Sequence, residues 1–284
     1  MKIKKILAGI DFGQATEKVF SYSLYFAEAL KASLTLLYVI DYLVTPPSYI
    51  FPYIDKEKRT AEKKFALLKK KLENAGIKAG SEVTVGRLHE SFKTEAEKVN
   101  ADMLVLGFRS HALRRSSSEK LIKGLQMPML VVRGEKTDSV RNDSVKIRKI
   151  LCPVDFSEGS VKALSVAREL KDYFFAKLDV IHVFPSHIIK KKINKSMDKE
   201  KVVKELIEHE TGRLSKILKD SGIRESGKID EGEPYKKIIS FSKEEDIDLI
   251  VIGARGLGFI KGMIIGSVTD SLLKTSPCPV IVIH

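Results

Sequence analysis

The sequence repeats itself at long range, and this repeat constrains the fold more than any other feature. Lys5–Phe12 (KILAGIDF) returns as Lys149–Phe156 (KILCPVDF), and Asp102–Gly107 (DMLVLG) returns as Asp248–Gly253 (DLIVIG). The copies are about 144 residues apart, whereas the repeats of solenoid proteins have periods of roughly 20 to 50 residues. The repeat therefore predicts two similar domains, each of ordinary single-domain size.

A polar segment separates the two copies. Residues 134–144 (GEKTDSVRNDS) show no hydrophobic periodicity and lie between two strand-like runs, which is typical of a linker. We place the first domain at residues 1–136, the linker at residues 137–145 and the second domain at residues 146–284.

Within each half, apolar runs of strand length alternate with helical patterns. In the second half we expect strands near 148–154, 178–183, 226–231, 248–252 and 279–283, and helices near 158–172, 195–221, 234–245 and 267–275. Such alternation predicts crossover connections and a parallel sheet with helices on both faces. Each half is thus predicted to be a doubly wound α/β domain, which binds ligands at the carboxyl ends of its strands.

A glycine-bearing loop follows one of these strands. It contains Gly253, Gly256, nine further residues and then Gly266-Ser267, where a helix is expected to start. Glycines let the backbone come close to an anion, and free N–H groups at a helix start point toward it. Ser267 is expected to cap this helix and to donate to a phosphate oxygen. The loop therefore predicts a phosphate site.

This glycine pattern, together with the repeat, resembles the universal stress protein family across both halves, almost end to end. The resemblance implies a five-stranded parallel sheet in each half, a Rossmann-like fold of the adenine nucleotide alpha hydrolase type, and ATP as a ligand of many members. By position it implies that Asp155 contacts adenosine and that Val183 offers main-chain atoms to adenine. The other residues that it implies for the site are Gly253, Gly256, Gly266, Ser267 and Thr269 around ribose and phosphates, and Pro153, Ile252, Arg255 and Val268 as lining. Asp155, Val183 and Gly253 end predicted strands, so we expect them to converge.

The first half departs from the pattern. Ser110 and Arg115 replace two of the glycines, and Gly107 and Ser116 have 8 residues between them, against 13 between Gly253 and Ser267. A shorter loop with arginines does not form the same backbone cradle. We predict that the first half does not bind ATP in the family's way. A different ligand and a purely structural role both stay open for it.

Composition limits the setting and the partners. No apolar run reaches the roughly 18 to 20 residues that span a bilayer, and the first residues do not form a signal peptide. Two cysteines, Cys152 and Cys278, predict buried free thiols rather than a disulfide framework. A cytoplasmic protein is expected. The net charge of +13 favours anionic ligands such as nucleotides, but few aromatic residues accompany the lysines of 190–204, so we do not predict a nucleic-acid partner.

Two further segments bear on assembly. Residues 42–53 (YLVTPPSYIFPY) are expected to form a loop that packs over the sheet or onto a neighbouring chain, because Pro46-Pro47 disfavours a helix. The last strands, 129–133 and 279–284, are expected at sheet edges. The resemblance implies that these strands pair as an intrachain pseudo-dimer, and it leaves a homodimer open.

No catalytic set is visible in the sequence. The six histidines show no metal-binding spacing, and His182 is expected to be a satisfied histidine inside the fold. One repeated carboxylate per site, Asp11 or Asp155, fits ligand recognition better than acid–base catalysis.

We therefore predict an ATP-binding regulatory protein of the stress response, with Mg²⁺ bridging the phosphates. A slow ATPase or nucleotidyl transferase, and a nucleotide-free tandem scaffold that binds a protein or another ligand, stay as alternatives. Changing Gly256 or Gly266 to Val is expected to abolish binding with little loss of folding.

Overall fold

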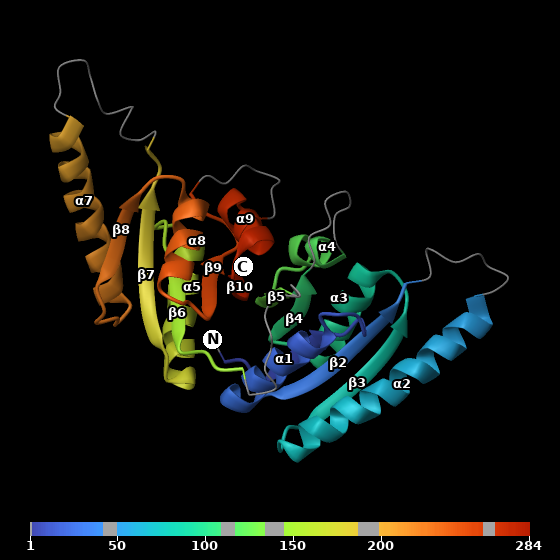
Figure 1. The fold of residues 1–284 in the computed structure, drawn as a ribbon. Coiled ribbons are helices and arrows are strands. Elements are labelled where there is room, and N and C mark those ends of the chain that lie inside the picture. Colours follow the sequence, from blue (N-terminus) through green and yellow to red (C-terminus); the bar gives the residue numbers. More distant parts are fainter. Residues whose placement is uncertain (1, 42–49, 109–116, 134–144, 187–198, 258–264) are drawn as a thin grey trace. The chain divides into compact units, whose positions relative to one another are not determined.

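The computed structural model describes residues 2–41, 50–108, 117–133, 145–186, 199–257 and 265–284 (Figure 1). The chain separates into two compact units, Met1–Lys146 and Ile147–His284. The predicted linker and the arginine-bearing loop of the first half fall almost entirely outside the described residues. In the described part of the chain, no helix is long and apolar enough to cross a membrane.

The first unit contains five parallel strands in the order β3-β2-β1-β4-β5. Its elements are β1 (Lys5–Gly9), α1 (Thr16–Leu30), β2 (Ser33–Ile40), α2 (Ile50–Asn74), β3 (Ala79–Val85), α3 (Leu88–Val99), β4 (Met103–Phe108), α4 (Ser117–Gly124) and β5 (Met129–Arg133).

The second unit repeats this plan, with five parallel strands in the order β8-β7-β6-β9-β10. Its elements are β6 (Lys149–Pro153), α5 (Glu158–Phe174), β7 (Lys177–Phe184), α7 (Lys199–Asp220), β8 (Gly227–Glu231), α8 (Pro234–Glu244), β9 (Leu249–Gly253), α9 (Ser267–Thr275) and β10 (Val280–Ile283). The predicted strands and helices of this half are confirmed to within a few residues.

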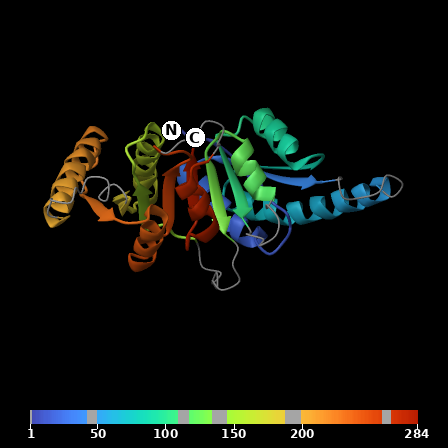
Figure 2. The ribbon, with the colours of Figure 1, turned by 90° about the horizontal axis from the view of Figure 1, so that it is seen from above.

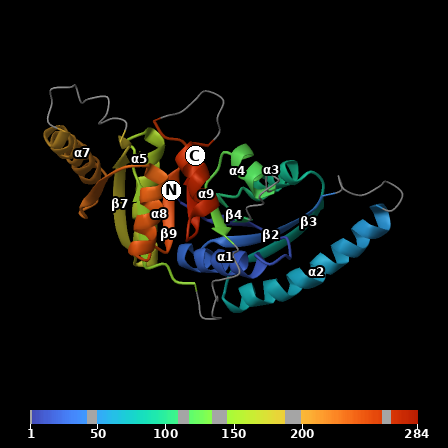
Figure 3. The same ribbon diagram turned by 45° about the horizontal axis from the view of Figure 1, so that its top comes forward.

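Helices cover both faces of each sheet (Figures 2 and 3). In Figure 3, α1 and α2 lie on one side of the first unit's strands, and α3 and α4 lie on the other. The central strands are almost wholly buried: every residue of β9 is buried, and so is every residue of β4 except the half-buried Gly107, because a parallel sheet covered on both faces has no solvent-facing side. The prediction of two doubly wound α/β domains is confirmed.

The strand order creates a switch point in the second unit. The chain runs from β6 through β7 to β8 and then returns to place β9 on the other side of β6. The connections that leave β6 and β9 therefore diverge, and the crevice between them is the usual ligand position in such folds. Asp155 follows β6 and Gly253 ends β9, so both lie at this crevice.

The opposite end of the sheet is held by the same device in both units. Asp102 Oδ2 accepts the N–H groups of Lys4 and Lys5 at 2.7 and 2.9 Å. Asp248 Oδ2 accepts those of Arg148 and Lys149 at the same two distances. Each carboxylate thus joins the residue before one central strand to the start of its neighbour.

One sequence expectation was wrong. The segment 42–53 was predicted to be a loop, but α2 begins at Ile50 and includes its last four residues. Pro52 lies in the first turn of α2, where a missing N–H costs no hydrogen bond and the fixed φ suits a helix. Residues 42–49, including the two adjacent prolines, lie outside the described residues.

Candidate functional site

Asp155 forms the centre of a hydrogen-bonded turn between β6 and α5. Its Oδ1 accepts the hydroxyl of Ser157 at 2.6 Å and the N–H of Ser157 at 3.1 Å. Its Oδ2 accepts the N–H of Leu257 at 2.9 Å, although Leu257 is 102 residues away in the sequence. The carboxylate therefore ties the loop after β9 to the turn after β6.

These donors keep the carboxylate charged. Burial by itself would raise the pKa of Asp155. The hydrogen bonds from the Ser157 hydroxyl, the Leu257 N–H and the Ser157 N–H favour the ionised form, and together they bring the pKa below its usual value. A carboxylate bound in this way is a hydrogen-bond acceptor at neutral pH.

The glycines of the loop are required by close approaches. A Cβ at Gly256 would lie 2.2 Å from Oδ2 of Asp155, and a Cβ at Gly253 would lie 2.7 Å from the carbonyl carbon of Gly159. A side chain at position 256 would therefore require the carboxylate of Asp155 to move; that Gly256→Val leaves the fold largely intact stays a prediction. Gly253 lets β9 pack against the first turn of α5.

Gly266 differs from the other two glycines. The nearest atoms to a Cβ placed there are 3.6 Å away, which is an ordinary van der Waals contact, and its φ of −71° is open to any residue. Its N–H donates to Ala254 O at 2.8 Å, which brings the two ends of the loop together. Nothing in the described packing requires glycine at this position, which leaves a ligand as a physical reason for it.

The start of α9 presents free donors beside Gly266. Ser267 was expected to cap this helix, but Gly266 occupies the N-cap position and Ser267 is the first helical residue. Ser267 is exposed. The N–H groups of Ser267, Val268 and Thr269 lie in the first turn, so they have no acceptor within the helix. The hydroxyl of Thr269 is already used, because it donates to Gly253 O at 2.8 Å.

The other predicted site residues lie around the same end of the sheet. Pro153 pairs with Ile181 in the β6–β7 register, so Val183, two residues further along β7, is level with Asp155. Val183 is buried with 8% of its surface exposed, and Ile252 with 6%. Arg255 and Val268 are half-buried. The structure thus gathers the predicted residues at the carboxyl edge of β6, β7 and β9, while their roles toward a ligand stay a prediction.

A comparison with known protein families identifies the fold. The family model described as "Universal stress protein family" matches residues 2–133 and again residues 146–284. The chain belongs to the universal stress protein family.

Some known universal stress proteins match about half of the chain, and others match nearly all of it. Universal stress protein MJ0577 of Methanocaldococcus jannaschii is 30% identical over 157 residues, which cover 49% of this chain and 96% of that protein. Universal stress protein Slr1230 of Synechocystis is 22% identical over 309 aligned residues, which cover 98% of this chain and 99% of that protein. The crystal structure of a universal stress protein from Archaeoglobus fulgidus matches with a TM-score of 0.74 and 26% identity, covering 100% of this chain and 99% of that one. The tandem arrangement is therefore shared with other universal stress proteins.

The sequence reasoning missed several residues of the universal stress protein site. Ser157 is the N-cap of α5, and its Oγ accepts the N–H of Ser160 at 3.2 Å while donating to Asp155. A Ser just before a helical pattern is a capping signal that the sequence offered. Gly159 was also missed, because its packing against Arg255 O, 2.8 Å from a Cβ built there, depends on the tertiary fold.

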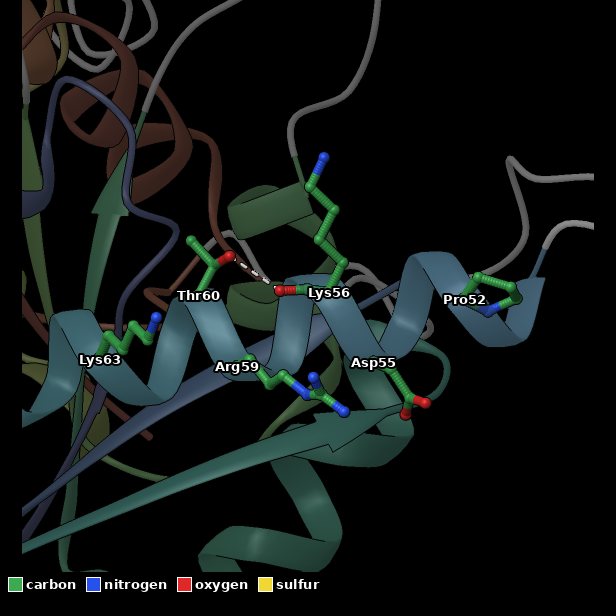
Figure 4. Close-up of a pocket in the computed structure, with 6 residues that line it drawn as sticks. All are labelled: Pro52, Asp55, Lys56, Arg59, Thr60 and Lys63. Carbon is green, nitrogen blue, oxygen red and sulfur yellow. Dashed lines mark hydrogen bonds between the residues drawn. The ribbon is translucent and has the colours of Figure 1, made fainter.

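A hollow on the first unit does not belong to this site. It has a volume of about 430 Å³ and is lined by Pro52, Asp55, Lys56, Arg59, Thr60 and Lys63. Figure 4 shows that all six side chains project from α2, where Thr60 Oγ1 donates to Lys56 O at 2.8 Å. These residues occupy the exposed side of one helix and include none of the predicted site residues, so we assign no ligand to the hollow.

Proposed function

We propose that this universal stress protein binds ATP in its second unit and acts as a regulator. The observation that carries the proposal is the contrast between the glycines. A Cβ at Gly253 or Gly256 would lie under 3 Å from a neighbouring atom, whereas a Cβ at Gly266, next to the first-turn N–H groups of α9, would make only ordinary van der Waals contacts. A helix start with free donors and an adjacent glycine suits a phosphate group.

Each residue has a part that follows from its position. Asp155, fixed and charged, would accept a hydroxyl of the adenosine part. Main-chain atoms of Val183 would contact adenine, and the N–H groups of Ser267, Val268 and Thr269 would bind phosphate oxygens. The remaining predicted residues, Pro153, Ile252 and Arg255, would line the crevice.

Mg²⁺, if it accompanies ATP, would be held chiefly by the nucleotide. The described residues contain no cluster of three or more His, Cys, Asp or Glu side chains suited to a metal. Mg²⁺ readily binds through substrate phosphates and water. A regulatory role agrees with a carboxylate that is bound by donors. ATP would then bias the chain toward the conformation that it binds more tightly.

The test is the nucleotide content of the purified chain. We expect about one ATP per chain on denaturation and a matching stoichiometry by titration calorimetry. Gly266→Val should lose binding because the side chain fills the phosphate position, while its unfolding transition stays close to wild type. Gly212→Val is the matched control, since a Cβ at Gly212 meets nothing within 4 Å, and it should bind ATP normally.

Other outcomes would redirect the proposal. Two equivalents of ATP with equal affinity would contradict the assignment of the site to the second unit. No nucleotide and no heat of binding would favour the scaffold alternative. Sustained phosphate release that is lost in Asp155→Asn would instead favour a slow ATPase. Pairing of the two halves and homodimerisation stay predictions.

A further inference from the structure

The residue after Asp155 has an unfavourable backbone conformation. Phe156 has a φ of 66°, in the left-handed region, where a Cβ comes too close to the following carbonyl oxygen. Bulky residues are rare there. Such a conformation persists when the surroundings hold it. It directly follows Asp155, whose Oδ2 accepts the N–H of Leu257 in the loop after β9.

Two side chains hold the ring of Phe156. The ring of His182, on β7, lies 4.3 Å from it between centroids. The guanidinium carbon of Arg213, on α7, lies 4.0 Å from the ring centroid, within the range of a cation–π contact. The ring thus connects the Asp155 turn to both the second strand and the long helix of the unit.

Both of these contacts are themselves fixed. His182 is buried, and its Nδ1 lies 2.7 Å from Val154 O, where the N–H form donates to the carbonyl. Arg213 Nη1 donates to Glu210 Oε2 at 2.9 Å, and Glu210 is 8% exposed. A chain of contacts therefore runs from Glu210 through Arg213 and Phe156 to the residue that carries the site carboxylate.

We propose that Phe156 is a positioning residue for Asp155, and that Arg213 of α7, by holding its ring, sets the nucleotide affinity of the second unit. The proposal rests on the proposed function, because the affinity that it concerns is that for ATP. Asp155 touches the ligand, whereas Phe156 and Arg213 act through the backbone turn.

The first unit shows which part of this arrangement is shared. Phe12 also has a positive φ, of 54°, and its ring lies 5.1 Å from those of Tyr38 and Phe65. Lys64 lies over it at 4.8 Å. The same ring lines a hollow of about 530 Å³ beside α2. The left-handed phenylalanine is therefore common to both units, while the Glu210–Arg213 contact belongs to the second.

The first experiment compares two neutral variants of α7 by ATP titration calorimetry on the full chain. Arg213→Met removes the cation–π contact of a side chain that is 44% exposed, and it is expected to weaken ATP binding about fourfold, which is the scale of such a contact at an exposed site. Lys216→Met removes the same charge from an exposed position of the same helix. It should change the dissociation constant less than about twofold, since a distant exposed charge is screened.

The second readout needs no nucleotide. The carboxyl carbon of Asp155 is followed by NMR against pH in the wild type, in Phe156→Leu and in Phe156→Tyr. Loss of the ring in Phe156→Leu should loosen the hydrogen bonds to Asp155 and raise its pKa toward the usual value, whereas Phe156→Tyr, which keeps the ring, should titrate like the wild type. Neither change alters the charge of the folded protein at low pH.

The outcomes separate the two proposals. A wild type that does not bind ATP would remove the proposed function, and the Asp155 titration alone would then decide the positioning role. An unchanged Asp155 titration in Phe156→Leu, or ATP affinity in Arg213→Met equal to that in Lys216→Met, would overturn the positioning role even if ATP binds.

Discussion

Asp11 and Asp155 occupy the same place in the two units, and within the residues that the structure describes their hydrogen-bond partners lie at different distances along the chain. Residues 109–116, which follow β4 as the Leu257 loop follows β9, lie outside that part. Asp11 Oδ1 accepts the N–H of Gly13 at 2.8 Å and the hydroxyl of Thr16 at 3.1 Å, both within five residues. Asp155 makes the equivalent local bonds to Ser157 and adds the bond to Leu257, 102 residues away. Asp11 is exposed, whereas Asp155 is half-buried.

The comparison locates the divergence of the two halves. At the amino ends of the strands, Asp102 and Asp248 make the same two hydrogen bonds in each unit. At the carboxyl ends, the described hydrogen bonds differ: Asp11 and Asp155 accept from different partners. Among the described residues, the two units thus share their contacts at the amino ends of the strands and differ at the carboxyl ends, where the proposed site lies.

The largest expected difference between the two units is in the unfolding free energy lost by Gly253→Ala and by Gly107→Ala. The Cβ at position 253 would lie 2.7 Å from the backbone of Gly159, whereas the one at position 107 would meet the methyl groups of Val19 and Ala15 at 3.1 and 3.3 Å. Because backbone yields less than a side chain, we expect losses in unfolding free energy of about 3 and about 1 kcal/mol. Urea denaturation measures both, and equal losses would show that the two strand ends are packed alike.

A smaller difference is expected between the unfolding free energies lost by Asp155→Asn and by Asp11→Asn. Asn keeps one acceptor oxygen and replaces the other with an amide donor, so at position 155 either the Leu257 or the Ser157 bonds are lost. We expect a cost of about 2 kcal/mol at position 155 and about 0.5 kcal/mol at position 11. If thermal unfolding ranks the two variants the other way, the bond to Leu257 does not stabilise the unit.

The smallest expected effect is the pH dependence of the stability that Asp155→Asn loses. The pKa of Asp155 is lower in the folded state than in the unfolded chain, so its stabilisation is fully present above the unfolded value of about 3.9. It is lost as the pH falls through the folded pKa. The stability gap between wild type and Asp155→Asn should be constant from pH 7 to pH 5 and narrow below about pH 4; a gap that widens in acid would reverse the assigned sign.

Much of the fold could be predicted because its signals are local. Buried parallel strands are continuous apolar runs, and the repeat shows four of the five twice, so β6 to β10 were placed to within a few residues. The two errors were also local. The helix-breaking effect of Pro46-Pro47 was extended to Ile50–Tyr53, which belong to α2, and Gly266, which can serve as an N-cap, was passed over for Ser267.

The details of the candidate site depend on contacts that no local pattern contains. The Asp155–Leu257 bond joins residues on different connections, and it forms only when β6 and β9 are neighbours. The left-handed Phe156 runs against its own conformational preference, so propensity would have predicted the opposite. Arg213 is one of many charged residues on α7, and only the packing of that helix shows that it covers Phe156.

The two buried thiols make the chain convenient for labelling. Cys152 and Cys278 are 0% and 8% exposed, and burial raises the pKa of Cys278 to about 12 and that of Cys152 further still. Because the thiolate is the reactive form, neither native cysteine competes for a maleimide dye in the folded protein. Ser267→Cys would thus place a single fluorophore at the exposed first residue of α9, where a change in its emission on addition of ATP would follow binding at the proposed site in real time.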